Sequence, residues 1–209
     1  MSDKVKDILE WVYCIIIALA LALLFRYFIA TPTIVKQRSM YPTLKENQRL
    51  ILNRTQRITG KEPKVGDIIT FEAPTEIYTS LDVDQTNPIA KYEKKSRGLF
   101  SKFAYYVLEI TKTSYIKRVI ATEGQHVVIE DGKVYVNNIE FKEDYLQPDV
   151  ITESNVFNDF IVPKGYIFAM GDNRTKSTDC RELGCIPVDK VEGIVSFRFW
   201  PLSNFGKIN

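Results

Sequence analysis

A single uninterrupted apolar run opens the chain, and shorter alternating runs follow it. Residues 11–29 are nearly all apolar, and Arg26 is the one charged residue among them. At ~1.5 Å per residue, a helix of this length approaches the ~30 Å hydrocarbon thickness of a bilayer. Arg26 lies near the end of the run, where a long side chain can extend to the headgroups. We therefore expect a membrane-spanning helix over residues 11–30, preceded by a short N-terminal segment, residues 1–10.

A cleavable signal peptide is the alternative interpretation of this run. Two features favour a retained anchor instead. Lys4 and Lys6 are offset by three nearby acidic residues, and no Ala-x-Ala site follows the run. The orientation of the anchor stays open on charge alone, because Lys4 and Lys6 precede the span while Arg26, Lys36 and Arg38 follow it.

Beyond Thr31-Pro32-Thr33, which should end the helix, the pattern is mostly that of β-strands. An Asp-Gly pair at Asp131-Gly132 separates two alternating runs and predicts a hairpin. Residues 31–209 therefore form the expected β-rich domain. The predicted strands are Thr33–Lys36, Arg49–Ile58, Asp67–Glu72, Tyr115–Thr122, Gln125–Glu130, Lys133–Val136, Tyr166–Met170 and Val191–Phe199.

A long polar stretch interrupts this pattern at about residues 73–113. It exceeds an ordinary connection, so we expect an inserted subdomain or lid, with a short helix over Leu99–Ile110. This stretch also contains the densest basic run. We expect that run to be a solvated loop face, with contact to an anionic membrane surface as the alternative. Its members are Lys91, Lys94, Lys95, Arg97 and Lys102.

Composition and charge exclude several classes of function. The formal net charge is +2, which gives no basis for nucleic acid as a partner. His126 is the one histidine, so a Ser-His-Asp protease would have to use it. A zinc site would have at most one imidazole. The alternating residues around His126 favour a strand or surface position.

Cys180 and Cys185 are five residues apart. They could form a short-loop disulfide or remain two free thiols, and spacing leaves both open. Cys14 lies in the apolar run, where it is expected to act as a small hydrophobic residue.

Three short blocks stand out as candidates for chemistry. The first contains Ser39, placed where a strand gives way to a turn, so that its hydroxyl could be exposed and the following backbone N–H groups could face an oxyanion. The second is Tyr115–Ile120, in which alternation places Lys117 on the same face as Tyr115 and Val119. An apolar setting disfavours the ammonium form and lowers the pKa of a lysine from ~10.4. A neutral amine of this kind could accept the proton of a serine hydroxyl.

The third block, Gly171–Arg181, is rich in polar residues and follows an apolar strand. Such a loop is ordered only if its side chains bond to one another. We expect Asp179 to form a bidentate pair with Arg174 or with Arg181. Ser177 could form a hydrogen bond to a nearby lysine amine and orient it. A solvent-exposed turn, strand edge or loop is the simpler interpretation of each block taken alone.

Together, the blocks resemble the bacterial type I signal peptidases. The resemblance rests on the order Ser39–Leu44, Gly66–Phe71, Tyr115–Ile120 and Gly171–Arg181, and with the apolar run it covers nearly the whole chain. It implies a mainly β, antiparallel-sheet catalytic domain with one N-terminal transmembrane helix. It also implies a serine endopeptidase that removes signal peptides from exported preproteins, cuts after a small residue such as Ala, and uses no metal or cofactor. The partners would be signal peptides and membrane lipid, and the catalytic domain would lie outside the cytoplasm.

The resemblance assigns roles to individual residues. Ser39 matches the nucleophile and Lys117 the general base. Ser177 matches the serine that orients the lysine. Asp179 and Arg181, with Arg174, match the ionic network that supports the site.

This chain departs from the family's pattern at several positions. Gln37 stands where the family usually has Ser or Gly, two residues before the nucleophile. Either the Gln37 amide takes this place in the oxyanion hole, or the Ser39 backbone N–H acts with little help. Such changes suggest a specialised member, serving substrates such as pilins. Two rivals are a Ser-Lys protease of the self-cleaving repressor type and a non-catalytic signal-peptidase-like factor in surface-protein or pilus assembly.

Overall fold

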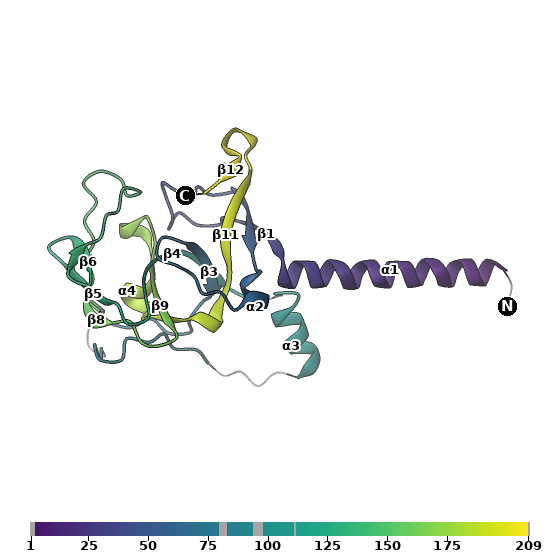
Figure 1. Cartoon of the computed structure of the whole chain (residues 1–209), viewed down its shortest axis with the longest axis horizontal. Coiled ribbons are helices and arrows are strands. Elements are labelled where there is room, and N and C mark those ends of the chain that lie inside the picture. Colours follow the sequence, from purple (N-terminus) through teal and green to yellow (C-terminus); the bar gives the residue numbers. More distant parts are fainter. Residues whose placement is uncertain (1–2, 80–82, 94–97, 111, 209) are drawn as a thin grey trace.

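A long helix projects from a β-rich body (Figure 1). The computed structural model describes residues 3–79, 83–93, 98–110 and 112–208. Helix α1 (Asp3–Phe28) projects from the body and contacts it through the half-buried Arg26, Tyr27 and Phe28, and Lys4–Phe28 is long and apolar enough to cross a membrane. The helix begins before the predicted span and ends two residues before its predicted end, because Ala30 already belongs to the first strand.

The main sheet is antiparallel and has the strand order β1-β2-β11-β3-β4-β9-β10, with β12 paired to β11. It is built from residues distant in sequence, because β11, close to the C-terminus, lies between β2 and β3. Its strands are β1 (Ala30–Ile34), β2 (Arg49–Asn53), β3 (Ile68–Glu72), β4 (Ser114–Thr122), β9 (Tyr166–Met170), β10 (Ile186–Pro187), β11 (Val191–Trp200) and β12 (Gly206–Lys207).

A smaller antiparallel sheet, of order β7-β6-β5-β8, lies at the end of the body away from α1 (Figure 1). Its β5–β6 hairpin turns at Asp131 and Gly132, both of which have positive φ, as the Asp-Gly signal predicted. His126 lies on β5 and contacts Asp159. The strands are β5 (His126–Glu130), β6 (Lys133–Val136), β7 (Ile139–Glu140) and β8 (Asp159–Ile161).

The predicted strand Arg49–Ile58 is wrong in its second half. Strand β2 ends at Asn53, where the side-chain Oδ1 accepts hydrogen bonds from the backbone N–H and the hydroxyl of Thr55. This local turn redirects the chain into the short helix α2 (Gln56–Thr59). Strands β7, β8, β10 and β12 were not predicted, because two or three residues are too few to show alternation. The remaining helices are α4 (Cys180–Leu183) and the 3₁₀ turns Arg174–Lys176, Val188–Lys190 and Leu202–Asn204.

Residues 73–113 connect β3 to β4 and contain helix α3 (Leu99–Tyr106), within the predicted helical segment. A parallel bridge from Ile89 to Cys185 and a hydrogen bond from the Tyr92 hydroxyl to the Glu72 carbonyl attach this connection to the body. Of the basic run, Lys91 is exposed and pairs with Glu76, and Lys102 is exposed on α3. Lys94, Lys95 and Arg97 lie outside the described residues.

Two apolar clusters pack on the main sheet. The larger contains Ile69 and Val119 and continues into the small sheet, while the smaller contains Ile68, Leu50 and Met40. Strand β3 contributes alternate side chains to the two clusters, and β4 places Val119, Ile120 and Ala121 in the larger cluster and Ile116 against the smaller one, so both strands are packed on two faces. This rigid pair of strands carries the candidate site.

Candidate functional site

Ser39 lies in the turn that follows the extended continuation of β1. Buried Val35 and Met40 hold the turn on both sides, and Ser39 itself is only 7% exposed. The backbone N–H of Asn173 donates to the Ser39 carbonyl over 2.9 Å, and the Asn173 amide donates to the Arg38 carbonyl. The Gly171–Arg181 block therefore positions the backbone of the serine turn.

Lys117 lies on β4 with its side chain directed toward Ser39. Its Nζ is 2.8 Å from Ser39 Oγ, and the residue is 2% exposed. Burial lowers the pKa of Lys117 from its ordinary value near 10.5 to about 8, against an opposing effect of the nearby Asp179 charge. The Tyr115 ring, 5.5 Å from Nζ, completes an apolar wall on the same face of the strand. The structure therefore places an amine that titrates near neutral pH in contact with a buried hydroxyl.

Gly171 separates Ser39 from Ser177. A Cβ at this position would lie 2.5 Å from the Ser39 carbonyl oxygen and 2.2 Å from Ser177 Oγ, so only glycine fits between them. The expected hydrogen bond from Ser177 to the lysine is absent from the described structure, where the buried Ser177 hydroxyl has no partner. The reason is local: this hydroxyl packs against Gly171, and the Lys117 amine is directed to Ser39 instead.

Asp179 forms its bidentate pair with Arg181, one of the two arginines that the sequence offered as partners. Arg181 Nε and Nη2 donate to the two Asp179 oxygens over 2.8 and 3.0 Å, and the Gly171 N–H donates to the same carboxylate over 2.9 Å. Burial alone would raise the pKa of Asp179, but the guanidinium and these donors outweigh it and lower the pKa. The pair therefore holds Gly171, and with it the gap between the two serines.

Arg174 binds Glu143 rather than Asp179. Its Nη1 donates to Glu143 Oε2 over 2.9 Å, and its Nε donates to the Gly171 carbonyl over 3.1 Å. Arg174 also contacts Thr152. Asp179 already has its guanidinium from Arg181, so Arg174 finds its counter-charge in a segment that the sequence motifs did not include.

Arg118, Asp172 and Thr43 form a third polar cluster that sequence reasoning missed. Arg118 Nε and Nη2 donate to Asp172 over 3.0 and 2.9 Å, and the Thr43 hydroxyl donates to Asp172 over 2.5 Å. This cluster joins β4 to both loops of the site. One signal was present: alternation places Arg118 on the same strand face as Ile116, and a buried arginine requires a counter-ion.

Cys180 and Cys185 are both buried free thiols. Burial raises the pKa of each thiol. In the part of the chain that the structure describes, no group of three or more His, Cys, Asp or Glu side chains is arranged to hold a metal ion.

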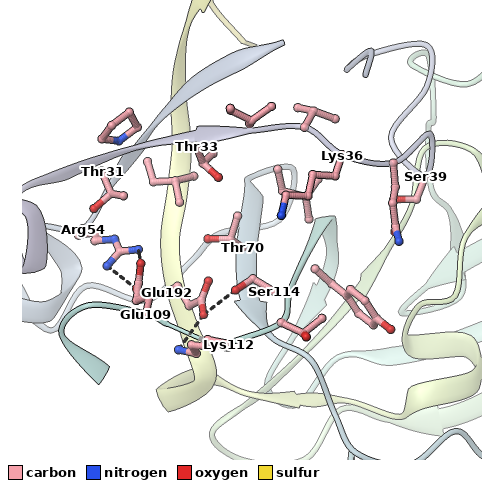
Figure 2. Close-up of a pocket in the computed structure, with 18 of the residues that line it drawn as sticks. Thr31, Thr33, Lys36, Ser39, Arg54, Thr70, Glu109, Lys112, Ser114 and Glu192 are labelled. Carbon is pink, nitrogen blue, oxygen red and sulfur yellow. Dashed lines mark hydrogen bonds and ion pairs between the residues drawn. The ribbon is translucent and has the colours of Figure 1, made fainter. Parts of the chain in front are cut away.

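A cavity of about 400 Å³ runs from Ser39 toward the end of α1 (Figure 2). One wall is β1 and its continuation to Gln37, and the other is the start of β4 from Thr113 to Ile116. Both walls present open strand edges. Strand β1 pairs with β2 alone, and β4 pairs with β9 only from Arg118 onward. An extended peptide laid in this cavity would find unpaired backbone groups on both sides and Ser39 at one end.

Comparison with known proteins gives a consistent result. Residues 8–200 match the family described as signal peptidase, peptidase S26. The chain is 32% identical to signal peptidase I T of Bacillus subtilis, over 97% of this chain and 90% of that protein. It is 31% identical to signal peptidase IB of Staphylococcus aureus, over 96% of this chain and 93% of that protein.

One further relative is a much longer protein, and one solved structure superposes on this chain only in part. The chain is 33% identical to thylakoidal processing peptidase 1 of Arabidopsis thaliana over 89% of its own length, but it spans only 46% of that protein. A crystal structure of a signal peptidase I from Enterococcus faecalis V583 is 25% identical, with a TM-score of 0.42, and the match covers 65% of this chain and 98% of that one. Because the family match spans residues 8–200 and the chain covers the two bacterial relatives almost end to end, the chain belongs to the signal peptidase family, peptidase S26.

Proposed function

We propose that this protein is a membrane-anchored serine endopeptidase that removes N-terminal signal peptides from exported proteins, cutting after small residues such as Ala. Ser39 is the nucleophile and Lys117 the general base. One observation carries the proposal: a buried lysine amine lies 2.8 Å from a buried serine hydroxyl at the end of an open-edged cavity. The names of the relatives supply the substrate class.

The chemistry follows from the protonation state of Lys117. A neutral amine accepts the Ser39 proton as Oγ attacks the scissile carbonyl carbon. The resulting ammonium then donates that proton to the departing amine, which leaves an ester between the substrate and Ser39. Lys117 is then neutral again and can deprotonate a water molecule that hydrolyses the ester. A pKa of about 8 keeps both forms accessible near neutral pH.

The oxyanion is assigned to the backbone N–H of Ser39 and to the Gln37 side chain. Gln37 lines the same cavity as Ser39 and its side-chain amide can donate a hydrogen bond, whereas the Arg38 side chain between them binds Glu46. Ser177 is assigned to orient Lys117, and its buried hydroxyl has no other partner in the described structure. Arg174, Asp179 and Arg181 position the loop that carries Ser177.

The proposed topology has α1 spanning the cell membrane once, with residues 1–10 on the cytoplasmic side and residues 31–209 outside. The orientation follows the resemblance to the signal peptidases, and two observations support a span next to the cavity. The apolar side chains of α1 are outside the body, and the cavity extends from Ser39 to Arg26 at the end of that helix. A signal peptide still held in the bilayer would therefore enter the cavity from the α1 end, with its cleavage site at Ser39.

The experiment uses the full chain in detergent or vesicles with an Ala-x-Ala reporter peptide. Ser39→Ala and Lys117→Ala should each abolish cleavage, while the exposed-residue controls Ser203→Ala and Lys133→Ala should retain it. Full activity in either dyad variant would refute the assignment. A wild-type protein that leaves the reporter peptide uncut would favour the non-catalytic assembly factor.

A further inference from the structure

The cavity beside Ser39 contains a buried polar group that the dyad does not use. Thr70 lies on β3 and is 4% exposed, and its hydroxyl has no hydrogen-bond partner. Figure 2 shows Thr70 between Ser39 and the ion pairs at the far end, with Ser114 below it and Thr33 above it. A buried hydroxyl without a partner is unfavourable, and a ligand group that bonds to it recovers that loss.

The far end of the cavity is polar as well. The Glu192 carboxylate, 4% exposed as a residue, accepts a bond from the Ser114 hydroxyl over 2.9 Å and pairs with Lys112 over 2.7 Å. An apolar ligand side chain placed here would displace water from the hydroxyls and return no hydrogen bond. A side chain with a hydroxyl would suit both Thr70 and its polar neighbours.

The strand register places Thr70 with respect to the reacting bond. Thr70 pairs with Ile116 on β4, the residue immediately before Lys117, and therefore lies on the opposite face of the sheet from the lysine. An extended peptide advances ~3.3 Å per residue and directs alternate side chains to the same side. If the last residue before the cut lies at Ser39, the side chain two positions earlier lies about 6–7 Å toward the α1 end, in the cavity that Thr70 and Thr33 line.

We propose that Thr70, with Thr33 and Ser114, forms a hydroxyl-binding subsite that selects Ser or Thr at the third residue before the cleavage site. The proposal rests on the proposed function, which supplies the direction of the substrate. Thr70 is then the residue that determines specificity. The preferred ligand is a short side chain that can both donate and accept a hydrogen bond.

The test compares two isosteric substrates on the full-length protein. Reporter peptides carry Thr or Val at the third residue before the cut and are otherwise identical. The wild type should favour the Thr peptide in kcat/KM by roughly three- to tenfold, the range expected for one net hydrogen bond. Thr70→Val should abolish this preference, and Thr70→Ser should restore it, which separates the hydroxyl from a loss of packing.

The outcomes distinguish two failures. Equal kcat/KM for both peptides in the wild type, or an unchanged preference in Thr70→Val, overturns the subsite and leaves the proposed function intact. A protein that cuts neither peptide overturns the proposed function and the subsite with it.

Helix α3 presents a second, independent feature. Leu99 and Phe100 are 88% and 83% exposed, and Phe103 and Tyr106 are also exposed. At about 100° per residue, Leu99, Phe100, Phe103 and Tyr106 lie within an arc of roughly 120° around the helix. The Tyr105 hydroxyl, from the other side of the helix, donates to Glu72 on the body over 2.7 Å. Leu99, Phe100 and Phe103 therefore point away from the body, while Tyr106 borders a cavity beside the end of α1.

The position of α3 is tied to the end of α1. Arg26 donates to the Leu108 carbonyl over 3.2 Å and lies 3.6 Å from Glu109, in the segment just after α3. Tyr106 shares a cavity with Tyr27 and Phe28. Figure 1 shows α3 beside the point where α1 joins the body. An exposed apolar helix face held at the end of a membrane-spanning helix lies at the depth of the headgroups.

We infer that the apolar face of α3 inserts into the surface of the bilayer that α1 spans. This role assigns a function to helix α3 in the connection between β3 and β4. It also keeps the α1 end of the Ser39 cavity close to the membrane. The exposed Lys102 on the same helix suits anionic headgroups.

Site-directed spin labels on the full chain in phosphatidylcholine–phosphatidylglycerol vesicles test this contact. The background is Cys14→Ser, because Cys180 and Cys185 are fully buried. Labels go at Phe100→Cys, at Leu19→Cys in α1, and at Ile161→Cys, an equally apolar exposed site on β8 at the far end of the body. Collision with oxygen should exceed collision with a water-soluble nickel chelate several-fold at positions 19 and 100, and not at 161.

Water-like accessibility at position 100 with lipid-like accessibility at 19 overturns the contact of α3 alone. Water-like accessibility at both positions overturns the membrane anchor, and the α3 contact with it.

Discussion

The pH dependence of cleavage is the sharpest consequence of the site. Burial lowers the pKa of Lys117 from 10.5 to about 8, a difference worth roughly 3 kcal/mol between the two protonation states. At pH 7.5 an amine with this pKa is neutral in about a quarter of molecules, against roughly one in a thousand for an unperturbed lysine. In the proposed mechanism only the neutral amine accepts the Ser39 proton, so kcat/KM should rise tenfold per pH unit below about pH 8 and level off above it.

The assay is the initial rate of reporter-peptide cleavage by the full-length protein in detergent, at constant ionic strength from pH 5.5 to 10. A control peptide with a fluorophore but no cleavable bond corrects for the optical response to pH. The reasoning would be refuted by a rate that keeps rising through pH 10, because Lys117 would then titrate as a solvated lysine. A flat profile would equally refute it, since no group that titrates in this range would then act as the base.

The other predictions concern folding and access to the site. Lys117→Met should raise the free energy of unfolding by up to roughly 3 kcal/mol at pH 7, because the folded state holds the charged amine unfavourably. The gain should disappear as pH rises from about 8 to 10.5, and denaturation at several pH values measures it. Asp172→Asn should destabilise the fold by about 3–5 kcal/mol, because Arg118 would keep a buried charge without its counter-ion; the same denaturation assay applies, and a loss below ~1 kcal/mol would contradict the prediction. Gly171→Ala should lower kcat more than Gly98→Ala, because the Cβ at position 171 would meet the Ser39 carbonyl at 2.5 Å, whereas Gly98 has open space around it and a φ of −62° that alanine adopts; an equal effect of both would contradict it. Reductant should leave the melting temperature unchanged, because Cys180 and Cys185 are free thiols, and a drop on reduction would indicate a disulfide.

Local sequence signals identified most of the larger elements. The apolar run predicted α1, alternation predicted the cores of β3, β4, β5, β6, β9 and β11, and Asp131-Gly132 predicted the β5–β6 hairpin. These predictions succeeded because the side-chain period and the turn geometry are properties of a few neighbouring residues. The strand predicted through Ile58 failed because the Asn53 side chain bonds to the backbone N–H of Thr55, and this local bond outweighed β propensity.

The pairing of charges required the tertiary structure. Asp179 had two candidate arginines within five residues, and both could reach it along the chain. Arg181 binds it, while Arg174 binds Glu143, 31 residues away in sequence. The cluster of Arg118 with Asp172 and Thr43 joins three separate segments and has no local signature.

The sequence by itself determined the kind of protein: one apolar helix of membrane length, a β-rich domain, and serine and lysine blocks in an order that resembles one family. Only the tertiary structure decided that Lys117 is buried, that its amine lies 2.8 Å from Ser39, and that Thr70 lines the adjacent cavity without a partner. The reason is physical. Periodicity and turn chemistry act over a few residues, whereas desolvation of an amine and contact across 78 positions of chain depend on how β1, β3 and β4 come together in one sheet.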